Sequence, residues 1–151
     1  MRVLGLCCTK DSLDFAIVDG TDRQSATKVH QQKCAAPAAA SRGADLVWVR
    51  KEVLSILDAH NVEGVVIRVA EVGGPGTSVS LGRAEVEGVV QEALATRGVR
   101  QVRVAAVDIR AAFAARNSSA LESALTGLPV LQGVAASRKG PLIAALTEIP
   151  A

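Results

Sequence analysis

Apolar and polar positions along the first third of the chain form three short runs separated by polar turns. Residues 2–7 are mostly apolar and end at a polar turn, and residues 13–18 form a second apolar run. Asp19-Gly20 then marks a tight reversal into a more polar segment, residues 24–33. Short alternating runs joined by turn residues predict an antiparallel meander, and the polar third run is typical of an edge strand.

The pattern changes after an alanine-rich connector at residues 35–41. From there, stretches with helical spacing alternate with short runs rich in β-branched residues. The pattern predicts a helix over residues 45–59, a strand over 62–69, a helix over 79–97 closed by Gly98, and a strand over 101–107. Strands that alternate with helices are typical of parallel pairing through crossover connections.

The last third of the chain contains helix-start signals. Asp108 is expected to N-cap a short helix, and Ser118 or Ser119 to cap another. The final helix is expected to begin near Lys139, because Pro141 is tolerated mainly in a first turn. The resulting order, β-β-β-α-β-α-β-α-α, predicts one α/β domain over residues 1–151, with a mixed five-stranded sheet and helices on both faces.

Composition excludes some functional classes. A chain of 151 residues has the size of one domain. Aromatic residues are 2% of the chain, too few for the stacking platforms of proteins that bind single-stranded nucleic acid. The net charge of +2 gives no overall basic field. Without a long apolar run or a signal-peptide pattern, we expect a cytoplasmic protein with no membrane partner.

The cysteines Cys7, Cys8 and Cys34 include no C-x-x-C pair, which favours a reducing compartment. His30 and His60 are candidate further ligands for a soft metal, but the spacing matches no zinc template. Adjacent strand residues also point to opposite faces. We therefore expect buried, unreactive cysteines and no cofactor.

Short motifs follow one another in a characteristic order. Residues 1–6 read Met-Arg-Val-Leu-Gly-Leu, residues 65–68 read Val-Val-Ile-Arg, and residues 80–88 are rich in small side chains. The segments at 108–110 and 144–147 come next. In this order they resemble the RuvC-type Holliday junction resolvases of the RNase H-like superfamily over nearly the whole chain, although each motif is short.

The resemblance implies positions for four metal-binding acids. In the resolvases these carboxylates hold two Mg²⁺ ions, since hard cations need several anionic oxygens. The corresponding positions are Cys7 (or Cys8), Arg68 (or Val69 after a one-residue slip), Ser137 and Gly140. None is acidic, and Arg68 would repel a cation. The resemblance therefore implies a catalytically degenerate, non-enzymatic binding or scaffold protein. Its partner would be structured DNA or a protein, and the helix at 79–97 implies a homodimer.

Two other readings stay open. Glu71 and Asp108 are the best members of a displaced acidic site, which would give a Mg²⁺-dependent, structure-specific endonuclease. Asp11 is interpreted as a turn residue and Asp14 as an outward position on the second strand. Nucleotide binding as in the actin-like ATPases is a third reading, but those proteins use two such domains and this chain has room for one.

Basic residues supply candidate contacts to nucleic acid. If they share a face, the second-half cations could follow a phosphate backbone, and otherwise they form a solvated surface. The candidates are Arg68, Arg110, Arg138 and Lys139. The loop at residues 72–78 lies between a strand and a helix, as phosphate loops do, but it lacks their lysine. We interpret it as a crossover loop, which in the resolvases lies near the DNA entrance.

Overall fold

The computed structural model describes residues 1–38, 41–69 and 81–151. The strands are β1 (Arg2–Cys8), β2 (Ser12–Asp19), β3 (Thr27–Ala35), β4 (Gly64–Arg68) and β5 (Gln101–Val104). The helices are α1 (Arg42–His60), α2 (Leu81–Thr96), α3 (Ala106–Ala112), α4 (Ser118–Thr126) and α5 (Lys139–Leu146), with short 3₁₀ turns η1 (Pro129–Leu131) and η2 (Ala136–Arg138). No helix among the described residues is long and apolar enough to cross a bilayer.

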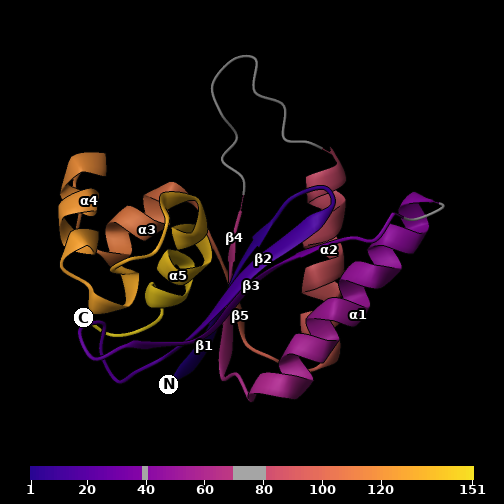
Figure 1. Ribbon diagram of the computed structural model, residues 1–151, viewed down its shortest axis with the longest axis horizontal. Helices are drawn as coiled ribbons and strands as arrows, with labels where there is room; N and C mark the ends of the chain where they lie inside the picture. Colours follow the sequence, from indigo (N-terminus) through magenta and orange to yellow (C-terminus); the bar gives the residue numbers. More distant parts are fainter. Residues whose placement is uncertain (39–40, 70–80) are drawn as a thin grey trace.

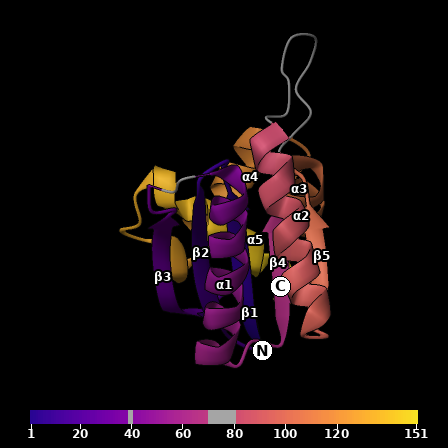
Figure 2. The same cartoon turned by 90° about the vertical axis from the view of Figure 1, so that its right-hand side faces the viewer.

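The five strands form one mixed sheet in the order β3-β2-β1-β4-β5. The first three strands pair antiparallel, whereas β4 lies parallel to both β1 and β5. Helices α1 and α2 cover one face, and α3, α4 and α5 lie on the other (Figure 1). Turned by 90°, the molecule presents α1 and α2 in front of the sheet (Figure 2). The predicted fold class is confirmed, with three helices after β5 where the predicted order has two.

Alternation along β1 divides the core into two layers. Leu4 and Leu6 pack with residues of α1 and α2, whereas Val3 packs with residues of α5 on the other face. All three side chains are fully buried. Burial of this kind stabilises a fold by roughly 1.5–3 kcal/mol for each large apolar side chain. The central strand is therefore held from both faces.

Gly5 sets the distance between β1 and α5. A Cβ atom there would overlap the carbonyl oxygen of Pro141 and lie 2.8 Å from the amide nitrogen of Ala145. The backbone of α5 thus lies directly against the central strand, an approach that only glycine permits. This contact fixes the start of α5 beside the carboxyl ends of β1 and β4.

The predicted tight reversal at Asp19-Gly20 is wrong, because residues 20–26 connect β2 to β3. Asp22 organises this longer turn by accepting the backbone N–H groups of Gln24 and Ser25 at 2.9 and 2.8 Å. An aspartate that accepts from the residues after it is a common turn former.

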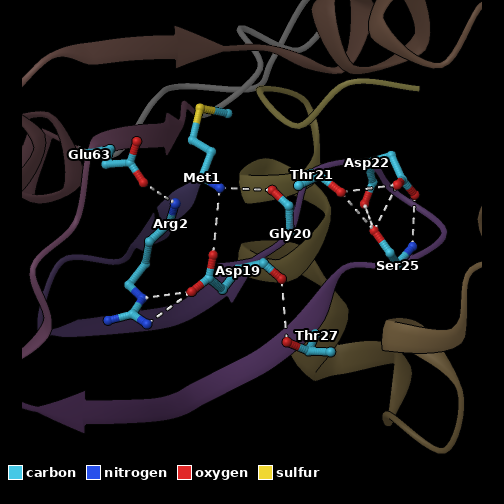
Figure 3. Close-up of polar contacts among 9 residues, drawn as sticks. All are labelled: Met1, Arg2, Asp19, Gly20, Thr21, Asp22, Ser25, Thr27 and Glu63. Carbon is cyan, nitrogen blue, oxygen red and sulfur yellow. Dashed lines mark hydrogen bonds and ion pairs between the residues drawn. The ribbon is translucent and has the colours of Figure 1, made fainter.

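The start of β1 is tied to the end of β2 beside this turn. The amino group of Met1 donates to the carbonyl oxygen of Gly20 at 2.9 Å, and the guanidinium of Arg2 binds Asp19 at 2.9 Å (Figure 3). The backbone N–H of Arg2 also donates to Glu63 at 2.8 Å, which links β1 to the approach of β4.

Two predicted helix caps are also wrong. β5 ends at Val104, and Ala105 is the N-cap of α3. Asp108 lies in the first turn, where its carboxylate accepts the backbone N–H of Ala105 at 2.8 Å. Asn117, rather than either serine after it, caps α4 by accepting from Ala120 at 2.9 Å. Asn, Asp and Ser are nearly equal as caps, so sequence alone could not rank them.

Arg23 anchors the C-terminal segment to the β2–β3 connection. Its guanidinium donates to the carbonyl oxygens of Leu146 and Ile149, both at 3.0 Å, and to that of Ala112 at 2.8 Å. The same group lies 4.3 Å from the centre of the Phe113 ring. One planar cation thus satisfies carbonyls from the ends of α3 and α5, which keeps the helical layer against the sheet.

Candidate functional site

One row of paired residues crosses the sheet near the carboxyl ends of β1 and β4. Lys33 on β3 pairs with Asp14 on β2, which pairs with Cys7 on β1, which pairs with Arg68 on β4. Directly paired residues present their side chains on the same face. Since Leu6 and Cys8 belong to the core under α1 and α2, this row faces the α5 side.

A pocket of about 550 Å³ opens over this row. Its described lining residues are Cys7, Cys8, Thr9, Asp14, Lys33, Arg68, Val69, Arg83, Ala136, Ser137, Gly140 and Pro141. The four positions that the resemblance assigns to metal-binding acids all lie in this lining, although they come from β1, β4, η2 and α5. The structure therefore brings together residues up to 133 positions apart in sequence, from Cys7 to Gly140.

The start of α5 closes one side of the pocket. A Cβ atom on Gly140 would lie 3.2 Å from the sulfur of Cys7 and 3.4 Å from Nη1 of Arg68. The first distance is tighter than ordinary van der Waals contact, and the second is at its lower limit. Glycine at this position lets the Arg68 guanidinium lie against the first turn of the helix.

Arg83 reaches the pocket from α2 and is held by two acceptors. Its Nε donates to Oε1 of Glu87 at 2.8 Å, and its Nη2 donates to the carbonyl oxygen of Arg68 at 3.0 Å. Glu87 is only 7% exposed, so its carboxylate is shielded from water and the charge-assisted bond to Arg83 is stronger than one at an open surface. The Arg83 side chain is therefore attached to the backbone of Arg68 at the end of β4.

Asp14 does not point outward, as the sequence predicted, but lines the pocket. Its Oδ1 is buried and lies 3.5 Å from Nη2 of Arg138, an ion-pair distance too long for a good hydrogen bond, and that oxygen has no hydrogen-bond partner among the described residues. Burial raises the pKa of Asp14, against the opposing charges of Arg138 and Lys33. This carboxylate therefore lies among cations that already offset its charge.

The cysteines do not form a common site. Burial raises the pKa of Cys7 to about 11, although the nearby Arg68 charge acts in the opposite direction, so the thiol is protonated at neutral pH. Cys8 and Cys34 are buried in the core under α1 and α2, on the other face of the sheet. A soft-metal site shared by the three thiols is incompatible with this arrangement.

The described residues of the pocket do not fit the Mg²⁺ pair that the resemblance implies. Divalent cations of this kind need several carboxylate or carbonyl oxygens. Asp14 is the one carboxylate in the described lining, and Lys33, Arg68 and Arg83 bring positive charge. Nowhere in the described ranges do three or more His, Cys, Asp or Glu residues come close enough to hold a metal ion.

The other candidate residues are distributed over the molecule. Arg138 lies beside the pocket through its contact with Asp14. Lys139 lines a separate hollow beside α4, and Arg110 lies on α3. Asp108 is exposed, accepts the backbone N–H of Ala105, and lies outside the described pocket lining. Glu71 and the loop at 72–78 lie outside the described residues.

Sequence reasoning missed three charged lining residues: Lys33, Asp14 and Arg83. The first two follow from the sheet register, since they pair in one row with Cys7. A correct register for the meander would have found them. Arg83 depends on how α2 packs over the end of β4, for which the sequence holds no local signal.

Solved structures with this fold include Holliday junction resolvases. Thermus thermophilus RuvC has a TM-score of 0.78 at 17% identity, covering 97% of this chain and 92% of that one. The T. thermophilus RuvC complex with a Holliday junction substrate has a TM-score of 0.76 at 17% identity, covering 97% and 91%. The yeast mitochondrial Holliday junction resolvase has a TM-score of 0.64 at 8% identity, covering 97% and 76%. No family model and no curated protein matches the sequence. At these identities the similarity establishes the RuvC-like fold.

Proposed function

We propose that this protein is a catalytically degenerate, RuvC-like module that binds branched or structured DNA in the cytoplasm without metal-dependent cleavage. The observation that carries the proposal is the pocket at the strand ends, where the positions expected for acids hold Cys7, Arg68, Ser137 and Gly140. Cations outnumber carboxylates three to one among its described lining residues. Such a pocket attracts a polyanion and repels the cations that a two-metal nuclease needs.

The fold supports the choice of DNA as the partner. One solved structure with this fold is a RuvC bound to a Holliday junction substrate. Arg68 and Arg83 lie in the pocket and Arg138 at its edge, so three guanidinium groups are gathered in one place. Guanidinium groups bind phosphate oxygens in a bidentate manner, and phosphate contacts from arginine and lysine supply the sequence-independent part of the affinity for DNA.

The proposal is tested with a four-way junction and a linear duplex of matched sequence. We expect binding of the junction in a gel-shift assay, weakening steeply as salt rises from about 50 to about 200 mM, because neutralised phosphates release counterions. With Mg²⁺ or Mn²⁺ the junction should remain intact. Metal-dependent cleavage that is lost in Glu71→Gln or Asp108→Asn would overturn the proposal in favour of a nuclease with displaced acids.

A second observation favours a protein contact as part of the same function. A groove of about 450 Å³ between α1 and α2 is lined mainly by apolar groups, among them Leu46, Val47 and Val89. The ion pair of Arg50 with Glu92, at 2.8 Å, joins the two helices within the same lining. Exposed apolar surface accompanied by charged groups is typical of a protein interface. The proposed function includes a homodimer formed through this groove, with the pocket on the opposite face of the sheet.

A further inference from the structure

We propose that the pocket at the strand ends is a metal-independent oxyanion site, in which Arg68, Arg83 and Lys33 bind a phosphate group directly. The inference deepens the proposed function, on which it rests for DNA as the source of that phosphate. It also accounts for the positive charge of the described lining residues at the place where the resemblance to the resolvases implies two Mg²⁺ ions.

The charge balance of the pocket favours an anion. Lys33, Arg68 and Arg83 are the cations of the described lining, and Asp14 is its one carboxylate. Asp14 lies 3.5 Å from Arg138, so its charge is already offset by a cation outside the lining. Arg83 is likewise paired with Glu87 at 2.8 Å, so the excess positive charge among the described residues comes from Lys33 and Arg68. An entering phosphate meets this charge in a concave place, where electrostatic attraction is stronger than at an open surface.

Arg83 is held in place before any ligand arrives, and Arg68 lies against the start of α5. Arg83 is fixed by Glu87 and by the carbonyl oxygen of Arg68, with donor–acceptor distances of 2.8 and 3.0 Å. Arg68 lies against Gly140, where a methyl group would come within 3.4 Å of its Nη1. The Arg83 guanidinium is already ordered by its two acceptors and loses little further freedom on binding, so more of each of its hydrogen bonds contributes to affinity.

Neutral donors complete the site. Ser137 contributes a hydroxyl at the edge of the pocket, and Gly140 belongs to the first turn of the eight-residue helix α5, whose positive end lies there. Cys7 is a protonated thiol at neutral pH and brings no negative charge that would oppose an anion. These groups add hydrogen-bonding capacity without changing the charge balance.

The first test uses inorganic phosphate as the probe and keeps EDTA present throughout. We expect phosphate to raise the melting temperature of the wild-type protein and to bind in calorimetry without any metal. Arg68→Gln should weaken phosphate binding about tenfold or more, because it removes charge-assisted hydrogen bonds. Lys33→Gln, on the exposed edge strand, should weaken it with little effect on folding.

Arg97→Gln is the matched control. It removes the same charge by the same chemical change, but Arg97 lies at the far end of α2, where it binds Asp58 at 2.9 Å. Its phosphate affinity should stay within about twofold of wild type, because Arg97 lies outside the described pocket lining and shares no partner with it. Phosphate binding that needs added Mg²⁺, that is absent, or that falls equally in the control would overturn the inference.

The second test asks whether the pocket binds a phosphate of the DNA backbone or free phosphate. It measures binding of the four-way junction by the same variants. Junction binding that falls in Arg68→Gln and Lys33→Gln but not in Arg97→Gln supports the pocket as a contact to the DNA backbone. Phosphate binding with no junction binding sustains the oxyanion site for free phosphate and overturns the proposed function. Junction binding unchanged in Arg68→Gln and Lys33→Gln leaves the proposed function standing and overturns the pocket as its DNA contact.

Discussion

His60 is a side chain whose protonation makes the stability of this fold depend on pH. Its ring, at the end of α1, stacks on that of His30 from β3 with centroids 5.2 Å apart, and Phe15 lies 5.5 Å from His30. Burial, followed by the charges of His30 and Arg2, lowers the pKa of His60 from its ordinary value. The folded state therefore resists protonation of this ring.

We predict that stability decreases as pH falls from about 7.5 to about 5.5. The unfolded chain takes up a proton near the ordinary histidine pKa of about 6.5, whereas folded His60 takes it up at lower pH, so protons favour unfolding across this window. The midpoint of urea unfolding measures the effect at the two pH values. His60→Gln should show a smaller difference than wild type. The pKa of Asp14 is raised in the folded state, so its protonation stabilises the fold as pH falls. This contribution is the same in wild type and in the variant, and it cancels when the two pH slopes are compared. Equal pH slopes in wild type and variant would contradict the prediction.

At the scale of elements, the contact of α5 with β1 is the tightest constraint described. It depends on Gly5, where an added Cβ would meet backbone atoms of Pro141 and Ala145. Backbone atoms cannot turn away as a side chain can, so the helix and the strand would have to separate. The pocket would change with them, because α5 supplies one of its walls.

Gly5→Ala should therefore destabilise the protein by about 2–3 kcal/mol or more, as overpacking of a core does. Gly88→Ala is its counterpart, because a Cβ on that exposed position of α2 has no atom within 4 Å. Alanine is the better helix former, so this second change should stabilise by up to about 1 kcal/mol. Denaturant unfolding of both variants checks the pair, and a neutral Gly5→Ala would show that α5 can shift.

The elements themselves could largely be predicted from sequence, since each apolar run has the period of a strand or a helix. Prediction failed where neighbouring residues offered equal local signals. Asn117, Ser118 and Ser119 were each suitable as the N-cap of α4, and the structure uses Asn117. The segment after Val104 could have continued the strand or begun a helix, and it begins α3. The choice there depends on tertiary packing, which local patterns do not contain.

At the scale of the whole molecule, the sheet separates two surfaces of different character. The α5 face holds the cationic pocket, and the α1–α2 face holds the apolar groove. Val47 beside the groove is 55% exposed. A dimer joined through α1 and α2 would leave both pockets uncovered, which a protein that engages two arms of branched DNA requires.

We predict that Val47→Glu weakens a dimer to monomers at micromolar concentration, because a carboxylate would be buried against the apolar groove. Val107→Glu is the matched control, since Val107 is 60% exposed but lies on α3, on the other face of the sheet. Light scattering coupled to gel filtration measures the mass of each. A monomeric wild-type protein, or an equal effect of both variants, would refute the groove as the interface.

The candidate site was harder to predict from the sequence than the fold, because its residues come together only through the long-range pairing of strands. Cys7, Arg68, Ser137 and Gly140 were found through the resemblance, and the structure brings all four together. Lys33 and Asp14 needed the pairing of three strands to be known at once. Residues that meet in a pocket through long-range strand pairing are not marked by any local sequence pattern, so the pocket cannot be predicted from the sequence around any one of them.

The pairing of Cys7 with Arg68 across β1 and β4 bears on how a metal site could arise in this pocket. An aspartate arising at Cys7 would sit beside the Arg68 guanidinium and be neutralised by it, whereas a glutamate arising at Arg68 would face a thiol and find no partner acid on β1. Among the described lining residues, neither exchange alone gathers the several carboxylates that a pair of divalent ions needs. We therefore expect that neither Cys7→Asp nor Arg68→Glu by itself would produce Mg²⁺-dependent cleavage, and that such activity would require both positions to change together.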